Sequence, residues 1–196
     1  MMTDGIKRMI LVDAETLNHA AFDIAVNFER MLNRPLPAMD VAKWLHAAAC
    51  DGRFAVNDEE IHALFLREKG HEDFRSLNFA NAPTGKDGFE YAGMHYRLEI
   101  EDCEGGVGHA FVETLNKLLD EDKEPETMVC LPGEDIAQYV GGILGRAPGV
   151  RSTLLAMDNV HGGGFAQEYL SSSISYALGV TDGEIRKHGT PKQFEI

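Results

Sequence analysis

The chain of 196 residues lacks a long apolar run. Hydrophobic residues make up 44% of it, but no stretch approaches the roughly 20 consecutive apolar residues that cross a bilayer as a helix. The segment Met1 to Lys7 is short and polar, without the apolar centre of a signal peptide. We therefore expect a cytoplasmic protein with no membrane association.

Paired cysteines are missing as well. Cys50, Cys103 and Cys130 stand far apart, and no two of them form a C-x-x-C motif. This spacing argues against a disulfide framework and against a zinc ribbon. We expect three ordinary buried or half-buried thiols.

Several motifs of nucleotide-binding proteins and hydrolases are absent. Neither G-x-G-x-x-G nor G-x-x-x-x-G-K-[ST] occurs, which argues against a dinucleotide site and a Walker-type site. His161-Gly162-Gly163-Gly164 looks like the oxyanion segment of lipases, but the chain has no G-x-S-x-G elbow to accompany it. Two explanations of this glycine-rich turn remain, an anion site before a helix N-terminus and a plain tight turn.

Basic residues are few relative to acidic ones. Lys and Arg total 18 whereas Asp and Glu total 32, so the formal net charge is -14. Phosphate neutralisation by basic residues supplies most non-specific affinity for nucleic acid, and no cluster of Lys or Arg is present here. The charge therefore disfavours RNA as a partner.

What the chain does have is an alternation of apolar and amphipathic segments. Strands are expected near residues 9–13, 61–66, 94–101, 127–131 and 150–158, and helices near 15–33, 41–51, 107–119, 136–144 and 165–178. The alternative for residues 61–66 is a helix, because the acids at 58–60 would also start one well. The strand at 94–101 alternates with period two, which is typical of a strand with one solvated face.

Such alternation produces right-handed crossovers and a parallel sheet covered on both faces. We predict a single α/β domain over residues 1–196, a three-layer α/β/α sandwich with a mostly parallel central sheet and Rossmann-like topology. A loop-rich insertion is expected at about 70–93 and a polar C-terminal tail from about 181.

Acidic residues follow several of the predicted strands. They are Asp13, Glu101 or Asp102, Glu134 or Asp135, and Asp158. Parallel strands end at one edge of the sheet, where ligands usually bind, so we expect these carboxylates to gather there. Oxygen ligands without His or Cys suit Mg²⁺ or Mn²⁺. The alternative is that each acid caps the helix that follows it.

These motifs resemble those of the NYN branch of the PIN-like nucleases. Such proteins begin with a strand that ends in a catalytic Asp, as Ile10-Leu11-Val12-Asp13 does. Gly105-Gly106-Val107-Gly108 stands in the place of the family's Lys-Gly-Val-Asp-like turn, and Leu131-Pro132-Gly133-Glu134-Asp135 in the place of its Ser-Gly-Asp-x-Asp turn. The resemblance covers roughly residues 7 to 178, and implies a PIN-like fold and a metal-dependent ribonuclease.

The chain departs from the family pattern at four positions. Gly108 occupies the place of the second Asp, and Pro132 replaces the Ser. Glu134 replaces the first Asp of the third motif, while the second falls on Ile136, which leaves Asp135 as an acid shifted by one place. A weakened or inactive nuclease is therefore as consistent with the motifs as a working one.

The catalytic candidates are Asp13, Asp102, Glu134 and Asp135, and the ligands for Mg²⁺ or Mn²⁺ are Asp13, Asp135 and Asp158. His19 and His109 lie near the same site in the sequence and are candidate proton carriers. The alternative is a non-catalytic protein-interaction module that keeps the fold and binds a protein partner or a second copy of the chain.

Overall fold

The computed structural model describes residues 6–57, 59–71, 73–120 and 125–189. The element order is β1 (Arg8–Asp13), α1 (Ala14–Leu32), β2 (Met39–Asp40), α2 (Val41–Asp51), β3 (Ile61–Glu68), β4 (Leu77–Asn78), β5 (Phe89–Tyr91), β6 (Met94–Cys103), α3 (Val107–Leu118), β7 (Thr127–Leu131), α4 (Ala137–Leu144), β8 (Arg151–Ala156), β9 (Ala166–Tyr169), α5 (Leu170–Ala177) and α6 (Asp182–Gly189). In these ranges no helix has the length and apolar content needed to span a membrane.

The central sheet has seven strands in the order β5-β6-β3-β1-β7-β8-β9. Every neighbouring pair is parallel except β5 and β6. Without β5, this is the order of doubly wound α/β folds, in which the strand order reverses beside the first strand. The predicted mostly parallel α/β sheet is confirmed, and its switch point lies between β1 and β7.

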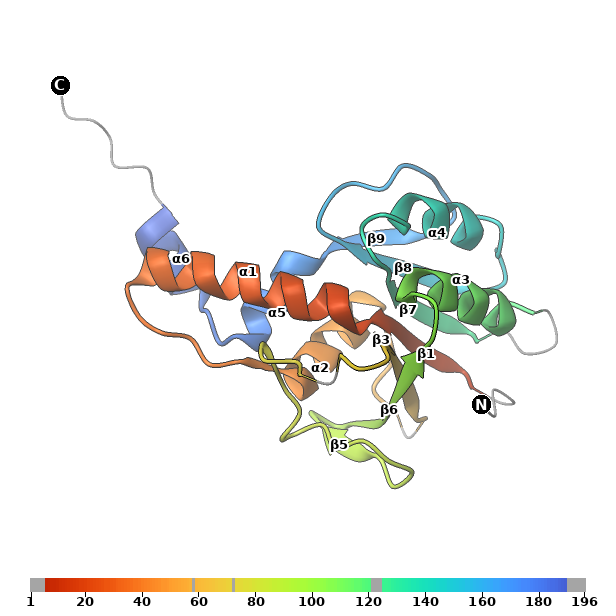
Figure 1. The fold of residues 1–196 in the computed structure, drawn as a ribbon, viewed down its shortest axis with the longest axis horizontal. Helices are drawn as coiled ribbons and strands as arrows, with labels where there is room; N and C mark the ends of the chain where they lie inside the picture. The colour runs from red at the N-terminus through yellow and green to blue at the C-terminus, as the bar shows by residue number, and fades with distance from the viewer. Residues whose placement is uncertain (1–5, 58, 72, 121–124, 190–196) are drawn as a thin grey trace.

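Helices cover both faces of this sheet (Figure 1). One core joins α1, α2 and α5 to Ile10 and Val12 of β1, and the other joins α3 and α4 to Met9 and Leu11. Because side chains alternate along a strand, Asp13 belongs to the α3/α4 side. The predicted three layers are therefore present, and β1 is buried in the middle of them.

Side-chain caps explain where the first two helices begin. Asp13 accepts a hydrogen bond from the backbone N–H of Thr16, and Asp40 accepts from those of Ala42 and Lys43. Each cap satisfies donors that the first turn of a helix leaves free. Helix α1 ends at Asn33, whose φ of 52° is left-handed.

Two segments differ from the sequence expectation. The predicted helix at 165–178 is wrong in its first part, since residues 166–169 form β9, which pairs with β8, and α5 begins only at Leu170. Pairing with an exposed sheet edge here overrides a short helical pattern. The second segment was expected to be a polar tail, but its first residues form the helix α6. Thr181 and Glu184 form reciprocal hydrogen bonds at the start of this helix, as in a capping box, and Arg34 forms an ion pair with Glu184.

Other expectations are confirmed, with one exception. Residues 61–68 form a strand and not a helix, because β1 and β6 pair with it on both sides. Cys103 and Cys130 are buried free thiols, as predicted, but the prediction is wrong for Cys50 of α2, which is a free thiol at an exposed position. Among its described residues the segment at 70–93 contains the short strands β4 and β5, and its status as an insertion stays a prediction.

Candidate functional site

Asp13 is the carboxylate that the fold places at the switch point. It is the last residue of β1, and only 6% of its surface is exposed. Burial raises the pKa of its carboxyl group above the usual value, although the hydrogen bond from the Thr16 N–H opposes this shift. A buried acid with a raised pKa at a ligand-binding edge is a candidate for function.

The carboxylates of Asp135 and Asp13 both lie close to Gly133. A methyl group built on Gly133 would lie 2.7 Å from Oδ1 of Asp135, 3.2 Å from Oδ2 of Asp13 and 3.7 Å from Oγ1 of Thr16. The two carboxylates and the hydroxyl therefore surround one small space. The turn after β7 brings Asp135 back toward the end of β1, with Gly133 leaving room for both. We call Asp13, Asp135 and Thr16 the oxygen cluster.

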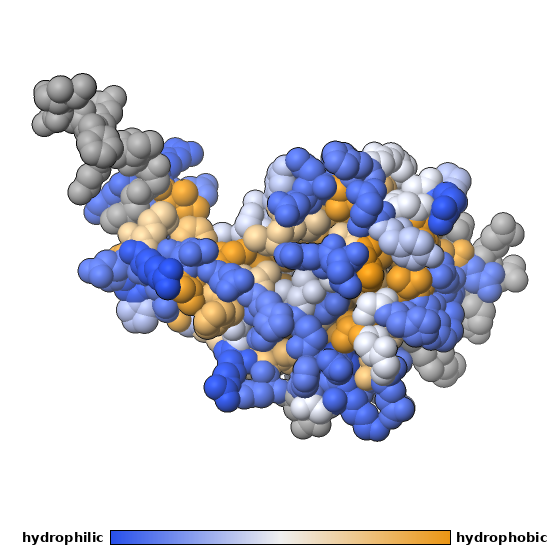
Figure 2. Space-filling model, turned by 45° about the horizontal axis from the view of Figure 1, so that its top comes forward, coloured by the Kyte–Doolittle hydropathy of each residue, from blue (hydrophilic) through white to orange (hydrophobic). Residues whose placement is uncertain are grey.

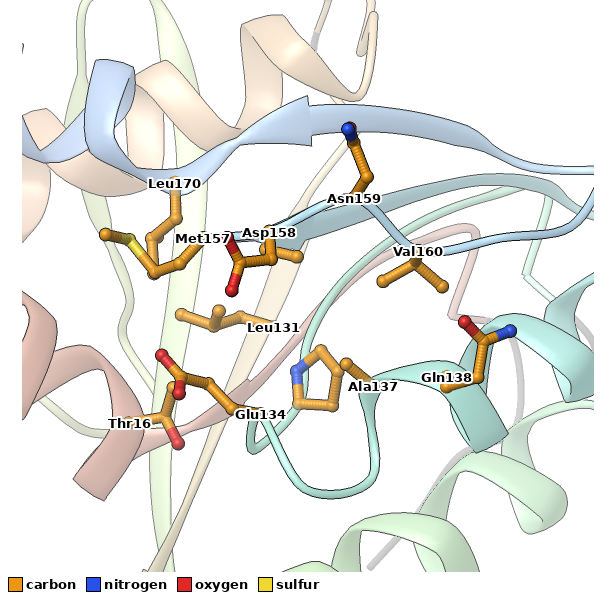
Figure 3. A pocket seen from close by; sticks show the side chains of 12 residues that line it. Thr16, Leu131, Glu134, Ala137, Gln138, Met157, Asp158, Asn159, Val160 and Leu170 are labelled. Atoms are coloured by element: carbon orange, nitrogen blue, oxygen red, sulfur yellow. The ribbon is translucent and has the colours of Figure 1, made fainter.

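A cavity of about 140 Å³ adjoins this cluster at the ends of β7 and β8. Thr16 lines it as well, together with Leu131, Glu134, Met157 and Asp158. Figure 3 shows the carboxylates of Glu134 and Asp158 on opposite sides of the Leu131 side chain, around the space that these residues line. We call this space the β7–β8 cavity. Within the part of the chain that the structure describes, none of its 12 lining residues is basic.

Two glutamine side chains hold the loop that carries Asp158. Gln138 of α4 donates to the carbonyl of His161 and accepts from the N–H of the same residue. Gln167 of β9 donates to the carbonyl of Asp158 and accepts from the N–H of Val160. Each amide thus bonds the loop twice, and this fixes the wall of the cavity. No signal in the sequence identifies these glutamines.

Asp102 lies elsewhere on the same edge. It belongs to β6, which is separated from β1 by β3. Its carboxylate accepts a hydrogen bond from Nε of Arg67, and this bond lowers the pKa of Asp102. Lys69 and Glu104 form a second ion pair beside it. In contrast, no ion pair of the described residues includes the other predicted acids, which are Asp13, Glu134, Asp135 and Asp158.

Two of the four positions that depart from the nuclease pattern, Gly108 and Ile136, lie close together. A methyl group built on Gly108 would lie 3.6 Å from Cγ2 of Ile136. The two places where the resemblance implies acids are thus neighbours, but they present apolar surface. The histidines considered as proton carriers, His19 of α1 and His109 of α3, are exposed and do not line the β7–β8 cavity.

The glycine-rich turn at 161–164 packs against the end of α4. A methyl group on Gly145 would lie 2.5 Å from the carbonyl oxygen of Gly163, and Gly164 has a φ of +88°. The turn leads into β9, so no helix N-terminus follows it directly. Close packing of two backbone segments accounts for these glycines.

The side chains at this edge can be compared with the ligands that a divalent cation needs. Across residues 6–57, 59–71, 73–120 and 125–189, no group of three or more His, Cys, Asp or Glu side chains is arranged to hold a metal ion. The oxygen cluster offers two carboxylates and a hydroxyl. Mg²⁺ is commonly bound in this way, through one or two carboxylates with water completing the octahedron. The donor set therefore fits a hard divalent cation, and metal binding by Asp13, Asp135 and Asp158 stays a prediction.

The fold and site define an α/β protein with a doubly wound sheet and an acidic site at its switch point. The chain belongs to the family described as a family of unknown function, DUF6621, which matches residues 5–185. The comparisons found no match among curated proteins and none among solved structures.

Proposed function

We propose that the protein is a phosphodiesterase of the NYN/PIN-like type that depends on Mg²⁺ or Mn²⁺ and cleaves RNA weakly. The observation that carries this proposal is the convergence of Asp13 and Asp135 on one space beside Thr16. The cluster lies at the switch point of a doubly wound sheet, where such folds bind their ligands. A PIN-like arrangement of the strands is part of the same proposal.

The residues have distinct roles in this account. Asp13 and Asp135 would hold the cation, with the hydroxyl of Thr16 as a neutral oxygen beside them. When bound, such a cation would supply Lewis-acid chemistry that offsets the charge of the phosphodiester. Glu134, which faces the β7–β8 cavity, takes the proton of the attacking water. Asp158 lies on the opposite wall and orients the leaving ribose, whose oxygen takes a proton from solvent when its bond to phosphorus breaks.

The cost of unpaired carboxylates supports this assignment. Burial disfavours the charged form of Asp13, and no basic side chain of the described residues pairs with it. A cation beside Asp13 would offset the cost of burying its charge. The cation also supplies the positive charge that a phosphodiester needs, which a chain of net charge -14 otherwise lacks.

The test is cleavage of a short single-stranded RNA labelled at one end. We expect slow cleavage with Mn²⁺, none with a chelator, and a loss of at least tenfold in Asp13→Asn and in Asp135→Asn. Asp102→Asn is the matched control, because its carboxylate is already paired with Arg67. Equal cleavage by the native chain and Asp13→Asn would indicate a contaminating nuclease and refute the proposal.

A second candidate is a non-catalytic protein-interaction module. Apolar side chains line a groove between the C-terminal half of α1 and α5 and α6, among them Phe28, Met31, Tyr176 and Ile185. Figure 2 shows apolar surface at this end of the molecule. Exposed apolar surface of this kind is typical of contact sites. This function becomes the better account if no cation binds to the oxygen cluster.

A further inference from the structure

A second cavity lies on the α3/α4 face of the sheet, away from the oxygen cluster. It spans β1, β3 and β6 and has a volume of about 420 Å³. Its floor is apolar, with Met9 and Leu64 as members. Figure 1 shows that β6 and β5 extend beyond the helices α3 and α4. We call this space the β3–β6 cavity.

The strand register brings three polar side chains to this cavity. His62 is the cross-strand partner of Met9 and of Arg97, and Leu64 is the partner of Glu99. Directly paired residues point to the same face of a sheet. His62, Arg97 and Glu99 therefore project together over the apolar floor, and all three line the cavity.

Glu60 holds two of these groups in place. Its Oε1 lies 3.0 Å from Nε2 of His62 and 3.1 Å from Nη2 of Arg97. The guanidinium group of Arg97 is therefore fixed by an acid outside the cavity. Its Nε, however, is buried and has no hydrogen-bond partner in the described chain. A buried donor without an acceptor is costly, so this N–H calls for an oxygen atom.

The other charges around the cavity have no internal partner. Lys86 and Glu99 line it, and neither is in an ion pair with another described residue. The charges of Lys86 and Arg97 balance those of Glu99 and Glu60. A cavity of zero net charge that holds cation and anion apart over an apolar floor complements a zwitterion better than a simple anion.

We propose that the β3–β6 cavity binds a small α-amino acid with an apolar side chain. The carboxylate accepts from Nε of Arg97 and pairs with Lys86, and the ammonium group pairs with Glu99. The side chain lies on Met9 and Leu64. This site is independent of the oxygen cluster and of the phosphodiesterase proposal.

The test is methyl NMR of the full chain with ¹³C-labelled methionine, with L-leucine as the probe. Met9 lines the β3–β6 cavity and Met157 lines the β7–β8 cavity, so each methyl group reports on one site. We expect a saturable shift of the Met9 signal at millimolar leucine and no shift of the Met157 signal. A Met9 signal that leucine does not move would overturn the proposal.

Two analogues separate the charges of the ligand. 4-Methylpentanoate keeps the carboxylate and side chain of leucine but lacks the ammonium group, whereas isopentylamine keeps only the amine. We expect both to bind at least tenfold more weakly than leucine. Equal affinity for all three compounds would show nonspecific apolar contact and refute the assignment.

Variants then assign the partners. Arg97→Lys keeps the charge beside Glu60 but removes the Nε donor, and should weaken leucine binding about tenfold. Lys86→Met, at an exposed position, should weaken it severalfold without affecting folding. Glu99→Gln should weaken binding of leucine but not of 4-methylpentanoate. Arg75→Gln, on an exposed side chain elsewhere, is the control, and affinity unchanged in Arg97→Lys and Lys86→Met would contradict the proposal.

Discussion

Two regions at the carboxyl edge of the sheet differ in whether their acidic side chains are paired with basic ones. At β3 and β6, Asp102 and Glu104 are each paired with a basic residue, Arg67 and Lys69. At β1 and β7, Asp13 and Asp135 converge on Gly133 without a described basic partner. Asp102 and Glu104 are thus each neutralised by a basic partner, whereas no ion pair of the described residues neutralises Asp13 or Asp135. This difference is the reason why we assign the proposed cation to Asp13 and Asp135 and not to Asp102.

Replacing one carboxylate at a time should have the largest effect on the stabilisation by Mn²⁺. A cation at 100 times its dissociation constant stabilises the folded state by about 2.7 kcal/mol, which raises the unfolding midpoint by several degrees. We expect Mn²⁺ to produce this rise in the native chain and in Asp102→Asn, but not in Asp13→Asn or Asp135→Asn. Thermal unfolding with and without Mn²⁺ measures it, and a rise retained in both of the latter variants would show that the cation binds elsewhere.

Gly133 offers a steric test that keeps every carboxylate. In Gly133→Ala, the new methyl group would lie 2.7 Å from Oδ1 of Asp135 and 3.2 Å from Oδ2 of Asp13, so the two groups must move apart. We expect Mn²⁺ affinity to fall at least tenfold, as measured by calorimetric titration. Gly142→Ala is the control, because nothing lies within 4 Å of its methyl position, and a helical alanine there adds about 0.5–1 kcal/mol of stability. Unchanged affinity in Gly133→Ala would place the cation outside this space.

The pH dependence of stability distinguishes Asp13 from a simple helix cap. Burial raises the pKa of Asp13 in the folded state, so its stabilising contribution is complete below the unfolded pKa and is lost as the pH rises through the folded pKa. Asn also caps helices well. Metal-free Asp13→Asn should therefore unfold at a higher temperature than the native chain at pH 7, and the difference should vanish near pH 3. A lower midpoint for the variant at pH 7 would show that the ionised carboxylate of Asp13 stabilises the fold, as a simple helix cap does.

Asp51 provides an unpaired acid away from the oxygen cluster. Burial, with Glu168 nearby, raises the pKa of Asp51 to about 6. Its stabilising contribution is therefore present below about pH 4 and lost as the pH rises through about 6. Asp51→Asn should raise the unfolding midpoint at pH 7 by a small amount and leave the rise caused by Mn²⁺ unchanged. A reduced Mn²⁺ effect would show that unpaired acids act together through net charge.

The sequence was sufficient for the sheet strands whose apolar runs are long, and for the place of Asp13 and Asp135 at their ends. One part of the fold was not accessible in this way. Strand β9 has only four residues, and its pairing with β8 is a tertiary contact that no local pattern specifies. The capping box of Thr181 and Glu184, by contrast, was readable as a T-x-x-E motif.

The candidate site depends on strand order, which explains what sequence reasoning missed. Whether Asp102 or Asp135 lies beside Asp13 follows from the position of β6 and β7 relative to β1. The ion pair of Asp102 with Arg67 needs the register of β3 and β6. Thr16 was identifiable from its place three residues after the cap, where its N–H is expected to bond Asp13.

Paramagnetic broadening of methionine methyl signals by Mn²⁺ tests directly whether Asp13 and Asp135 bind a divalent cation. Met157 lines the β7–β8 cavity beside the oxygen cluster, whereas Met9 lines the β3–β6 cavity. We predict that Mn²⁺ at low stoichiometry broadens the Met157 signal in the native chain and in Asp102→Asn, and leaves it sharp in Asp13→Asn and Asp135→Asn. Equal broadening in all four proteins, or none in the native chain, would contradict the account.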